Sequence, residues 1–233
     1  RLQPDWVLVQ GDTTTVQVAA LCAFYRRIHV GHVEAGLRSH DLLAPFPEEL
    51  NRRIAGLVAD LHFAPKQGAA ENLYREGVPR ARVRITGNTG IDALLKIAVE
   101  VRKRPPPLAS EITAFLERHP QMVLITGHRR ENFGKGFRSI CRAISRLAQE
   151  NPPVGFLYPV HLNPQVRGPV YEIMHGHPNV LLCAPQEYRA FVHLMDRAYL
   201  ILSDSGGVQE EAPGLGKPVL VMREGTERPE GIA

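Results

Sequence analysis

The fold that we expect for this chain follows from one stretch, YLILSDSGGVQEEAPGLGKPVLVMREGTERPEG, at residues 199–231. The apolar run at 199–202 is typical of a buried parallel strand. A polar glycine turn at 203–207 follows it, and then come a helical stretch at 208–214 and a second apolar strand at 218–222. A strand, a glycine turn and a helix in this order direct free backbone N–H groups and the positive end of the helix dipole toward an anion.

The turn of this stretch has the composition of a phosphate-binding site. Gly206 and Gly207 let the backbone approach a phosphate closely, and Ser205 can add a hydroxyl donor. Glu210 and Glu211 follow in the first turns of the helix, where one carboxylate is placed to accept from a ribose diol. The alternative is a capped helix after a tight turn, because small residues commonly connect strands to helices.

The rest of the chain repeats this alternation of strand and helix. Segments with helical periodicity, such as 14–26 and 136–149, lie between most of the apolar runs. This pattern is typical of parallel α/β sheets with helices on both faces. The predicted strands are residues 6–9, 29–33, 61–63, 83–85, 122–125, 155–160, 180–183, 199–202 and 219–222.

We therefore predict the α/β class, with two doubly wound, Rossmann-like parallel-sheet domains. The domain boundary is expected within 86–108, where a strand ends and a helix leads into a proline triplet. Residues 1–87 would form the N-terminal domain, 88–108 a connecting helix and linker, and 109–233 the C-terminal domain. Doubly wound sheets bind ligands at the carboxyl ends of their strands, so we expect the functional residues there.

Composition places the chain among globular proteins. Its 233 residues, 44% of them hydrophobic, can bury a sizeable core. Cys22, Cys141 and Cys183 are far apart, lie in apolar segments and form no CxxC motif, so we expect buried free thiols in a reducing, cytoplasmic compartment rather than disulfides or zinc. No apolar run approaches the length that spans a bilayer, so we expect no membrane association.

The charge of the chain does not indicate nucleic-acid binding. The formal net charge is +4, and the sequence pI is about 9.1. The one dense basic cluster, Arg102-Lys103-Arg104, precedes three prolines and is typical of a solvated helix end before a linker. An acidic small molecule accounts for the charge equally well.

Three acidic residues follow the predicted strands of the first domain. Asp12 comes after the first strand, Glu34 after the second, and Glu48 opens a helix. Each has an ordinary alternative: a helix N-cap at Asp12 or Thr13, an exposed Glu34–Arg38 pair, and dipole compensation by Glu48. Like charges that converge on one cleft raise each other's pKa and make general acids and bases near neutral pH, so we expect an acid–base site if the three meet.

The second domain has its own cluster in TGHRRENFG, residues 126–134. His128 is flanked by arginines at the end of a predicted strand, which suits a pyrophosphate site, and the alternative is a surface loop. His161 in YPVHLNP is a weaker case of the same kind. His175 and His177 lack a carboxylate or cysteine at ligand spacing, so we interpret them as a solvated turn rather than a metal site. We interpret four further histidines as structural: His29, His62, His119 and His193.

Taken in order, the motifs GDTTT, GHVEAGLR, PFPEELNRR, ITGNTGIDAL, TGHRREN, YPVHLNP and SDSGGVQEEAPGLGKPVLVMREGTERPEG resemble those of the non-hydrolysing UDP-N-acetylglucosamine 2-epimerases. The resemblance covers essentially the whole chain. It implies a fold like that of the GT-B glycosyltransferases and interconversion of UDP-GlcNAc and UDP-ManNAc, through elimination of UDP to a 2-acetamidoglucal and re-addition. It implies no nicotinamide and no metal, a homodimer, and a role in cell-surface polysaccharide synthesis. In some bacterial members UDP-GlcNAc is also an allosteric activator.

The resemblance also assigns roles to single residues. It places the catalytic acids on Asp12, Glu34 and Glu48 and the catalytic histidine on His128. Arg129 and His161 resemble part of the regulatory site. Its substrate-binding residues are a cleft arginine, a residue beside the uracil, the diphosphate turn and a ribose-binding glutamate: Arg52, Phe191, Ser205, Gly206, Gly207 and Glu211. For Phe191 a core aromatic of an amphipathic helix is an equal alternative.

Two family segments do not occur in this sequence. The opening Gly-Thr-Arg-Pro-Glu segment would lie upstream of Arg1 and the closing helix beyond Ala233, so we expect the chain to be part of an epimerase. Two alternatives stay open. A UDP-sugar-dependent GT-B glycosyltransferase explains the nucleotide site but not the acidic residues. An inactive nucleotide-sugar binder is the second alternative for a chain that lacks the opening segment.

Overall fold

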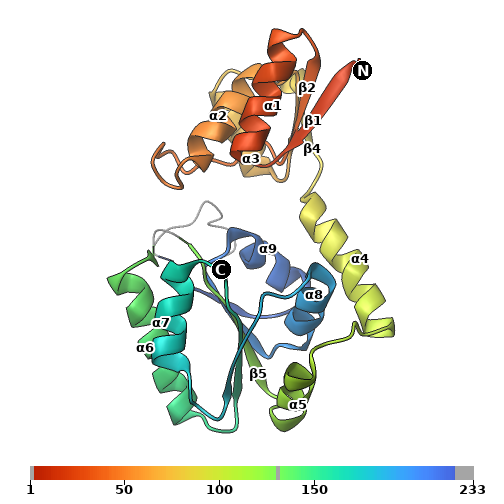
Figure 1. Ribbon diagram of the computed structural model, residues 1–233. Helices are drawn as coiled ribbons and strands as arrows, with labels where there is room; N and C mark the ends of the chain where they lie inside the picture. The colour runs from red at the N-terminus through yellow and green to blue at the C-terminus, as the bar shows by residue number, and fades with distance from the viewer. Residues whose placement is uncertain (1–2, 130–131, 224–233) are drawn as a thin grey trace. The chain divides into compact units, whose positions relative to one another are not determined.

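A computed structural model describes residues 3–129 and 132–223 of the chain. The chain divides into two compact units, Arg1–Thr89 and Gly90–Ala233, and each contains one parallel sheet (Figure 1). The predicted class, α/β with two parallel Rossmann-like sheets, is confirmed. The end of the decisive stretch, residues 224–231, and two residues of the TGHRREN motif, 130–131, lie outside the described residues.

The first unit is a four-stranded sheet in the order β1-β2-β3-β4. Its strands are β1 (Trp6–Gln10), β2 (His29–Val33), β3 (Leu61–Ala64) and β4 (Val83–Ile85). Its helices are α1 (Thr14–Tyr25), α2 (Glu48–Val58), α3 (Gln67–Arg75) and the short 3₁₀ helix η1 (Arg80–Arg82). Because spatial order follows chain order, right-handed crossovers put the connecting helices on one face of the sheet. The carboxyl ends of β1 and β2 are therefore neighbours, in register from Trp6↔His29 to Gln10↔Val33.

The second unit is a five-stranded sheet in the order β7-β6-β5-β8-β9. Its strands are β5 (Met122–Thr126), β6 (Gly155–Pro159), β7 (Val180–Cys183), β8 (Leu200–Ser203) and β9 (Val219–Val221). Its helices are α4 (Thr89–Lys103), α5 (Ser110–Arg118), α6 (Lys135–Glu150), α7 (Pro164–Met174), α8 (Tyr188–Arg197) and α9 (Gly206–Gly214). The strand order reverses between β5 and β8, so the loops that follow these two strands meet at a topological switch point.

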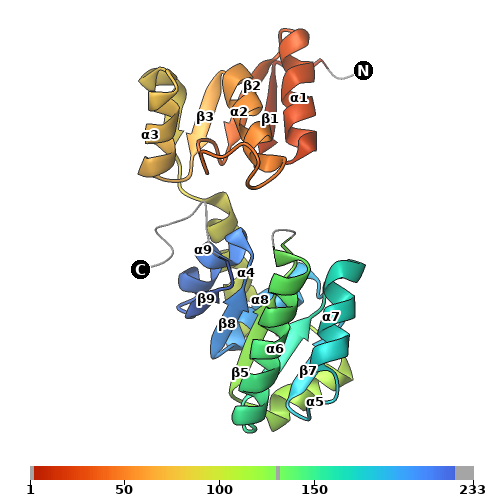
Figure 2. The same cartoon turned by 90° about the vertical axis from the view of Figure 1, so that its left-hand side faces the viewer.

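Two apolar cores sandwich this second sheet. Met122 and Leu124 of β5 face the core formed with α4, α5, α8 and α9. Val123 and Ile125 of the same strand face the core formed with α6 and α7. Figure 2 shows α6 and α7 together in front of the sheet. The strand is buried on both faces, which is why it reads as an unbroken apolar run in the sequence. The helix predicted as a connector, α4, also contributes its buried face to this unit's core.

The prediction of buried thiols is right for two cysteines and wrong for the third. Cys141 and Cys183 are buried, whereas Cys22 on α1 is exposed. Helix α1 carries apolar residues on all sides, so its sequence does not reveal which face packs on the sheet. Among the described residues, no helix combines the length and the apolar character needed to cross a membrane.

Candidate functional site

Each unit gathers polar side chains at the carboxyl ends of its strands. In the first unit, Asp12, Glu34, Glu48, Glu49 and Arg52 come from the ends of β1 and β2 and from the start of α2, and we call them the carboxylate cluster. In the second unit, the loops that follow β5 and β8 meet at the switch point, and we call them the switch-point loops.

Asp12 follows β1 in a turn that leaves its carboxylate available. Gly11 has a φ of 81°, and its N–H donates to the Val33 carbonyl at 3.1 Å, which ties the turn to β2. Thr13 caps α1, because its hydroxyl accepts the Val16 N–H at 3.3 Å. The carboxylate of Asp12 instead accepts from Nη1 of Arg52 at 2.6 Å. The N-cap alternative therefore applies to Thr13 and not to Asp12.

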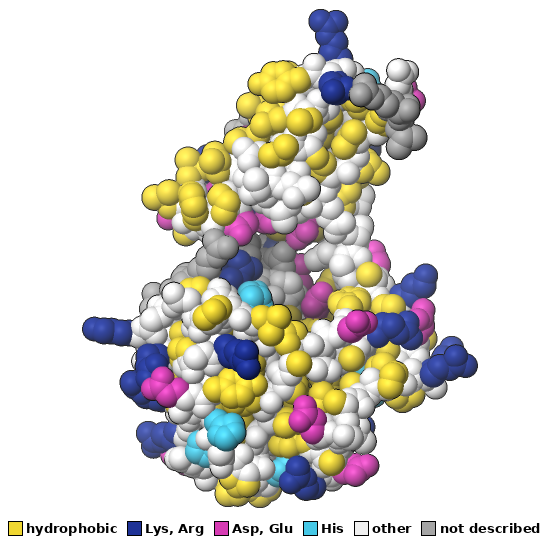
Figure 3. Space-filling view, in the orientation of Figure 1, with side chains coloured by type: hydrophobic (Ala, Val, Ile, Leu, Met, Phe, Trp, Pro, Cys, Tyr) yellow, Lys and Arg dark blue, Asp and Glu magenta, His cyan; other side chains and the backbone are white. Residues whose placement is uncertain are grey.

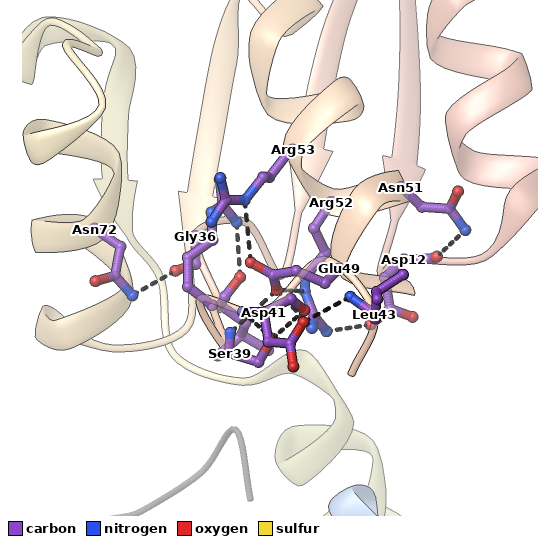
Figure 4. Close-up of polar contacts among 12 residues, drawn as sticks. Asp12, Gly36, Ser39, Asp41, Leu43, Glu49, Asn51, Arg52, Arg53 and Asn72 are labelled. Atoms are coloured by element: carbon purple, nitrogen blue, oxygen red, sulfur yellow. Dashed lines mark hydrogen bonds and ion pairs between the residues drawn. The ribbon is translucent and has the colours of Figure 1, made fainter. Parts of the chain in front are cut away.

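Two buried side chains hold the backbone of this turn. Nδ2 of Asn51 donates to the Asp12 carbonyl at 2.8 Å (Figure 4). Nε2 of His32 lies 2.8 Å from the Gly11 carbonyl, so this nitrogen carries the proton and donates. Burial is the largest influence on His32 and lowers its pKa, which keeps the ring neutral at physiological pH. The Gly11–Asp12 and Asp12–Thr13 peptides are thus held from β2 and α2.

Glu34 lies beside this turn. One of its carboxylate oxygens is 3.7 Å from the position that a Cβ on Gly11 would take. Its backbone has a φ of 65°, in the left-handed region that non-glycine residues rarely adopt. Arg38 is buried and forms a two-point ion pair with Glu76, at 2.7 Å for both contacts. The exposed Glu34–Arg38 pair considered from the sequence is therefore not formed.

The two adjacent glutamates at the start of α2 have different environments. Glu48 is half-buried, and its Oε2 atom is buried without a hydrogen-bond partner among the described residues. Glu49 is fully buried and accepts from Ser39, Arg52 and Arg53 (Figure 4). Successive helical residues point about 100° apart, so the pair directs one carboxylate into the protein and leaves the other for a different partner.

A buried carboxylate organises the switch-point loops. Asp204 is 0% exposed and accepts from the backbone N–H groups of His128 at 3.0 Å and Arg129 at 2.9 Å. It also accepts from Nδ2 of Asn132 at 3.2 Å. From β6, the Tyr158 hydroxyl donates to the Gly127 carbonyl at 2.8 Å. The loop after β5 is therefore tied both to the end of β8 and to β6.

The imidazole of His128 lies above this carboxylate. Its Nδ1 atom is 3.8 Å from Oδ1 of Asp204, and 41% of its side chain is exposed. Its ring stacks on that of His161, with 5.5 Å between centroids. Burial lowers the pKa of His128, Asp204 opposes this shift, and Arg129 and His161 add to it. At neutral pH the ring is therefore a neutral donor and acceptor rather than a cation.

The turn after β8 leads directly into α9. Ser205 precedes the helix and makes no side-chain cap, and the helix begins at Gly206, two residues earlier than predicted. Among residues 3–129 and 132–223, a Cβ on Gly207 would meet only the Ser205 hydroxyl oxygen, at 3.8 Å, so the packing of these residues does not itself require glycine there. Glu211 lies on α9 and raises the pKa of Tyr188 after the larger effect of burial, which places the two near each other.

Two further predicted residues belong to the second unit, and only His161 contacts the switch-point loops, through the ring of His128. Phe191 on α8 is partly buried and packs against the unit's core. His161 is exposed and its Nδ1 atom accepts the Asn163 N–H at 3.1 Å. Residues 3–129 and 132–223 contain no group of three or more side chains that could hold a metal ion. His177 instead makes a 2.7 Å hydrogen bond with the Ser145 hydroxyl.

The structure brings Asp12, Glu34 and Arg52 together in the first unit. In the second unit it brings His128 to the end of β8, where the Ser205 turn begins. The sequence reading missed four buried residues that hold these groups: His32, Glu49, Asn51 and Asp204. Glu49 had a readable signal, because its spacing of three and four residues to two arginines is the spacing of helical ion pairs.

Comparison with known proteins agrees with these motifs. The sequence model of the UDP-N-acetylglucosamine 2-epimerase family matches residues 1–233. The UDP-N-acetylglucosamine 2-epimerases of Yersinia pestis and Escherichia coli K12 are each 54% identical to this chain and match 99% of it. The chain spans 62% of the length of these relatives.

Solved structures show the same likeness. The UDP-GlcNAc 2-epimerase from Neisseria meningitidis bound to UDP-GlcNAc is 47% identical, with a TM-score of 0.89, over 98% of this chain and 62% of that one. The Methanocaldococcus jannaschii enzyme in complex with UDP-GlcNAc and UDP is 35% identical, with a TM-score of 0.82, over 98% of this chain and 63% of that one. The resemblance inferred from the motifs is thus confirmed, and the chain belongs to the UDP-N-acetylglucosamine 2-epimerase family.

Proposed function

We propose that the complete protein is a UDP-GlcNAc 2-epimerase, which interconverts UDP-GlcNAc and UDP-ManNAc. The observation that carries this proposal is that two carboxylates follow the neighbouring strands β1 and β2 in a chain of this family: Asp12 is bound by Arg52, and Glu34 lies against Gly11, the residue before Asp12. A glycosyltransferase of the same fold does not need several acid–base groups around its sugar. The chain's relatives are also named as epimerases and not as transferases.

The proposed chemistry is an elimination followed by re-addition. A base takes the proton from C2 of the sugar, the electron pair forms the C1–C2 double bond, and the C1–O bond to UDP breaks. UDP then adds back to C1 while C2 takes a proton on the opposite face. The C2 proton is weakly acidic, so its base must be well placed and shielded from water. Acid–base groups on both faces of the ring would require more than one carboxylate, and we assign these roles to Asp12, Glu34 and Glu48.

We assign the departing diphosphate to the Ser205-Gly206-Gly207 turn. The positive end of α9 and the N–H groups of its first turn stabilise the charge that develops on the leaving oxygen. The room that the described residues leave for a Cβ at Gly207 supports this assignment, since a glycine there allows a ligand to approach the backbone closely. His128 is neutral at rest, so it acts as a hydrogen-bond donor, and an approaching dianion would favour its protonation.

The remaining assignments follow the family resemblance. Glu211 accepts from the ribose, and Phe191 lies beside the uracil. We assign Arg52 to the substrate region through Asp12, which it binds. Only 2% of the Arg52 side chain is exposed, whereas 32% of the Asp12 side chain is. Arg129 and His161 would contribute to a regulatory site for UDP-GlcNAc. We place the protein in the cytoplasm, in keeping with its free cysteines.

Solvent deuterium distinguishes the candidate functions. The full-length protein that contains this chain should incorporate deuterium at C2 of UDP-GlcNAc in D₂O without any acceptor substrate. A glycosyltransferase would show no exchange at C2, and an inactive binder would bind UDP in calorimetry without exchange. Either of these results would overturn the proposed function.

We also propose a homodimer that forms through α1 and α2. These helices expose apolar side chains, and Figure 3 shows hydrophobic groups gathered over α1. Tyr25 is 80% exposed and Leu57 is 85% exposed. Light scattering should give a dimer for the wild type and a monomer for Tyr25→Lys with Leu57→Lys. Leu220→Lys, at a 57% exposed position of the second unit, is the matched control and should stay dimeric. A double variant that remains dimeric would refute this interface.

A further inference from the structure

We infer that Glu49 is a positioning residue for the reaction site: its buried carboxylate sets the orientation of Arg52, and Arg52 sets that of the Asp12 carboxylate. The catalytic consequence rests on the proposed function, whereas the positioning itself is a property of the fold. The family resemblance gives Glu49 no role, because it assigns the catalytic acid of the motif PFPEELNRR to the neighbouring Glu48.

Glu49 has the surroundings of a group that is held in one place. Its side chain is 0% exposed. Oε2 accepts from the Ser39 N–H at 3.1 Å and from Nε and Nη2 of Arg52 at 3.2 and 2.9 Å, and Oε1 accepts from Nε of Arg53 at 3.2 Å. Burying a carboxylate is costly unless it is paired and hydrogen-bonded. Burial would raise the pKa of Glu49, but the hydrogen bonds from Ser39 and Arg52 outweigh it and lower the pKa, so the group stays ionised.

Arg52 transmits this placement to Asp12. Its guanidinium is a rigid plane, and Nε and Nη2 on one edge bind Glu49. Once that edge is fixed, the direction of Nη1 is fixed as well, and Nη1 donates to Oδ2 of Asp12 at 2.6 Å. Asn51 already holds the Asp12 backbone. The rotation of the carboxylate is the remaining freedom, and Arg52 removes it.

A second buried arginine in the same unit provides the comparison. Arg38 donates through Nε and Nη2 to the two carboxylate oxygens of Glu76 near the end of α3, whereas the same atoms of Arg52 both donate to Oε2 of Glu49. The remaining Nη1 atom of Arg38 donates to the Leu37 carbonyl rather than to Asp12. Glu76→Gln therefore removes one carboxylate from a buried arginine, as Glu49→Gln does, without touching Arg52. Both variants should be less stable than the wild type, but only Glu49→Gln should disturb Asp12.

The test uses the full-length protein with wild type, Glu49→Gln, Glu49→Asp and Glu76→Gln. Glu49→Gln should lower kcat by about 100-fold, the loss typical of a small misplacement of a reacting group, with UDP affinity unchanged. Glu49→Asp keeps the charge but shortens the reach, so its kcat should fall by less. Glu76→Gln should keep kcat within about 2-fold of wild type. Equal kcat values for Glu49→Gln and Glu76→Gln would overturn the inference. It would also be overturned if the kcat of Glu49→Gln fell only as much as its fraction of folded protein.

A second readout does not depend on activity. In ¹⁵N NMR spectra the Nε–H of Arg52 should exchange slowly with solvent in the wild type and in Glu76→Gln, and faster in Glu49→Gln, which removes the charge that holds it. An Arg52 signal as protected in Glu49→Gln as in the wild type would also overturn the inference. If the wild type shows no exchange at C2, the proposed function fails, yet these spectra still decide whether Glu49 positions Arg52.

Discussion

The carboxylate cluster and the switch-point loops use buried carboxylates in different ways. In the first unit, Glu49 binds cationic side chains, and one of them binds Asp12. In the second unit, Asp204 accepts backbone N–H groups of the loop after β5. The first arrangement orients charged side chains, and the second shapes a backbone. We therefore expect substitutions in the first unit to affect chemistry and substitutions in the second to affect nucleotide binding.

The largest expected effect tests the first half of this comparison. Asp12→Asn and Glu34→Gln remove the proposed acid–base groups, so each should lower turnover by about 1,000-fold, within the usual range for general acid–base catalysis. UDP affinity, measured by calorimetry, should be unchanged. Variants that epimerise at the parent rate would show that these carboxylates are not the catalytic groups.

Asp204→Asn tests the second half. The amide cannot accept from the loop N–H groups of His128 and Arg129 as the carboxylate does. A hydrogen bond to a charged group contributes about 1.5–3 kcal/mol, so UDP affinity should fall by about 10-fold or more as the loop loses its shape. Glu172→Gln, which removes an exposed ion pair with Arg138, is the control and should bind UDP normally. Wild-type UDP affinity in Asp204→Asn would contradict the expectation that the buried carboxylate of the second unit supports nucleotide binding.

Gly207→Ala separates binding from stability in one substitution. The part of the chain that the structure describes leaves room for the added Cβ, and alanine is favoured over glycine in a helix by about 1 kcal/mol, so Tm should stay the same or rise. The methyl group would stand where we place the diphosphate, so UDP affinity should fall by a few-fold. Unchanged affinity would mean that the diphosphate does not approach this residue.

As pH falls, the first unit should lose stability through His62 before the carboxylates of its ion pairs become protonated. Burial, and then the neighbouring His32, lower the pKa of His62 to about 4. The unfolded chain therefore binds this proton more readily, so His62 favours folding above pH about 6.5 and this contribution is lost as pH falls toward 4. The pKa values of Glu49 and Glu76 are lowered. The stability that their ionised carboxylates contribute is therefore lost only as pH falls below the ordinary glutamate pKa.

Thermal unfolding between pH 7 and pH 5 checks this expectation. The Tm of the wild type should fall over this range, and that of His62→Gln should fall less. His175→Gln replaces an exposed histidine and should follow the wild type. Parallel curves for wild type and His62→Gln would contradict the predicted contribution.

Much of the fold was predictable because buried parallel strands read as apolar runs. Val83–Ile85 and Val180–Cys183 were predicted with the bounds that the structure shows. The start of α9 was predicted late, because Gly206 and Gly207 have low helix propensity, and the terminal strand β9 is one residue shorter than predicted at Met222.

The candidate site was predictable only in part. The ends of strands can be predicted from the sequence, because an apolar run stops there. Three of the predicted site residues follow such ends: Asp12, Glu34 and His128. The partners of these residues come from elsewhere in the chain, as Arg52 does for Asp12, and no local pattern connects them.

The sequence alone determined the class of the fold, the family and the positions of the polar residues at the strand ends, because hydrophobic periodicity and long motifs are local properties of the chain. Tertiary structure alone decided that Glu49 is fully buried while Glu48 is half-buried, that Thr13 rather than Asp12 caps α1, and that Cys22 is exposed. These outcomes depend on which face of a helix meets the sheet and on which distant side chain meets a carboxylate, and a linear pattern does not contain that information.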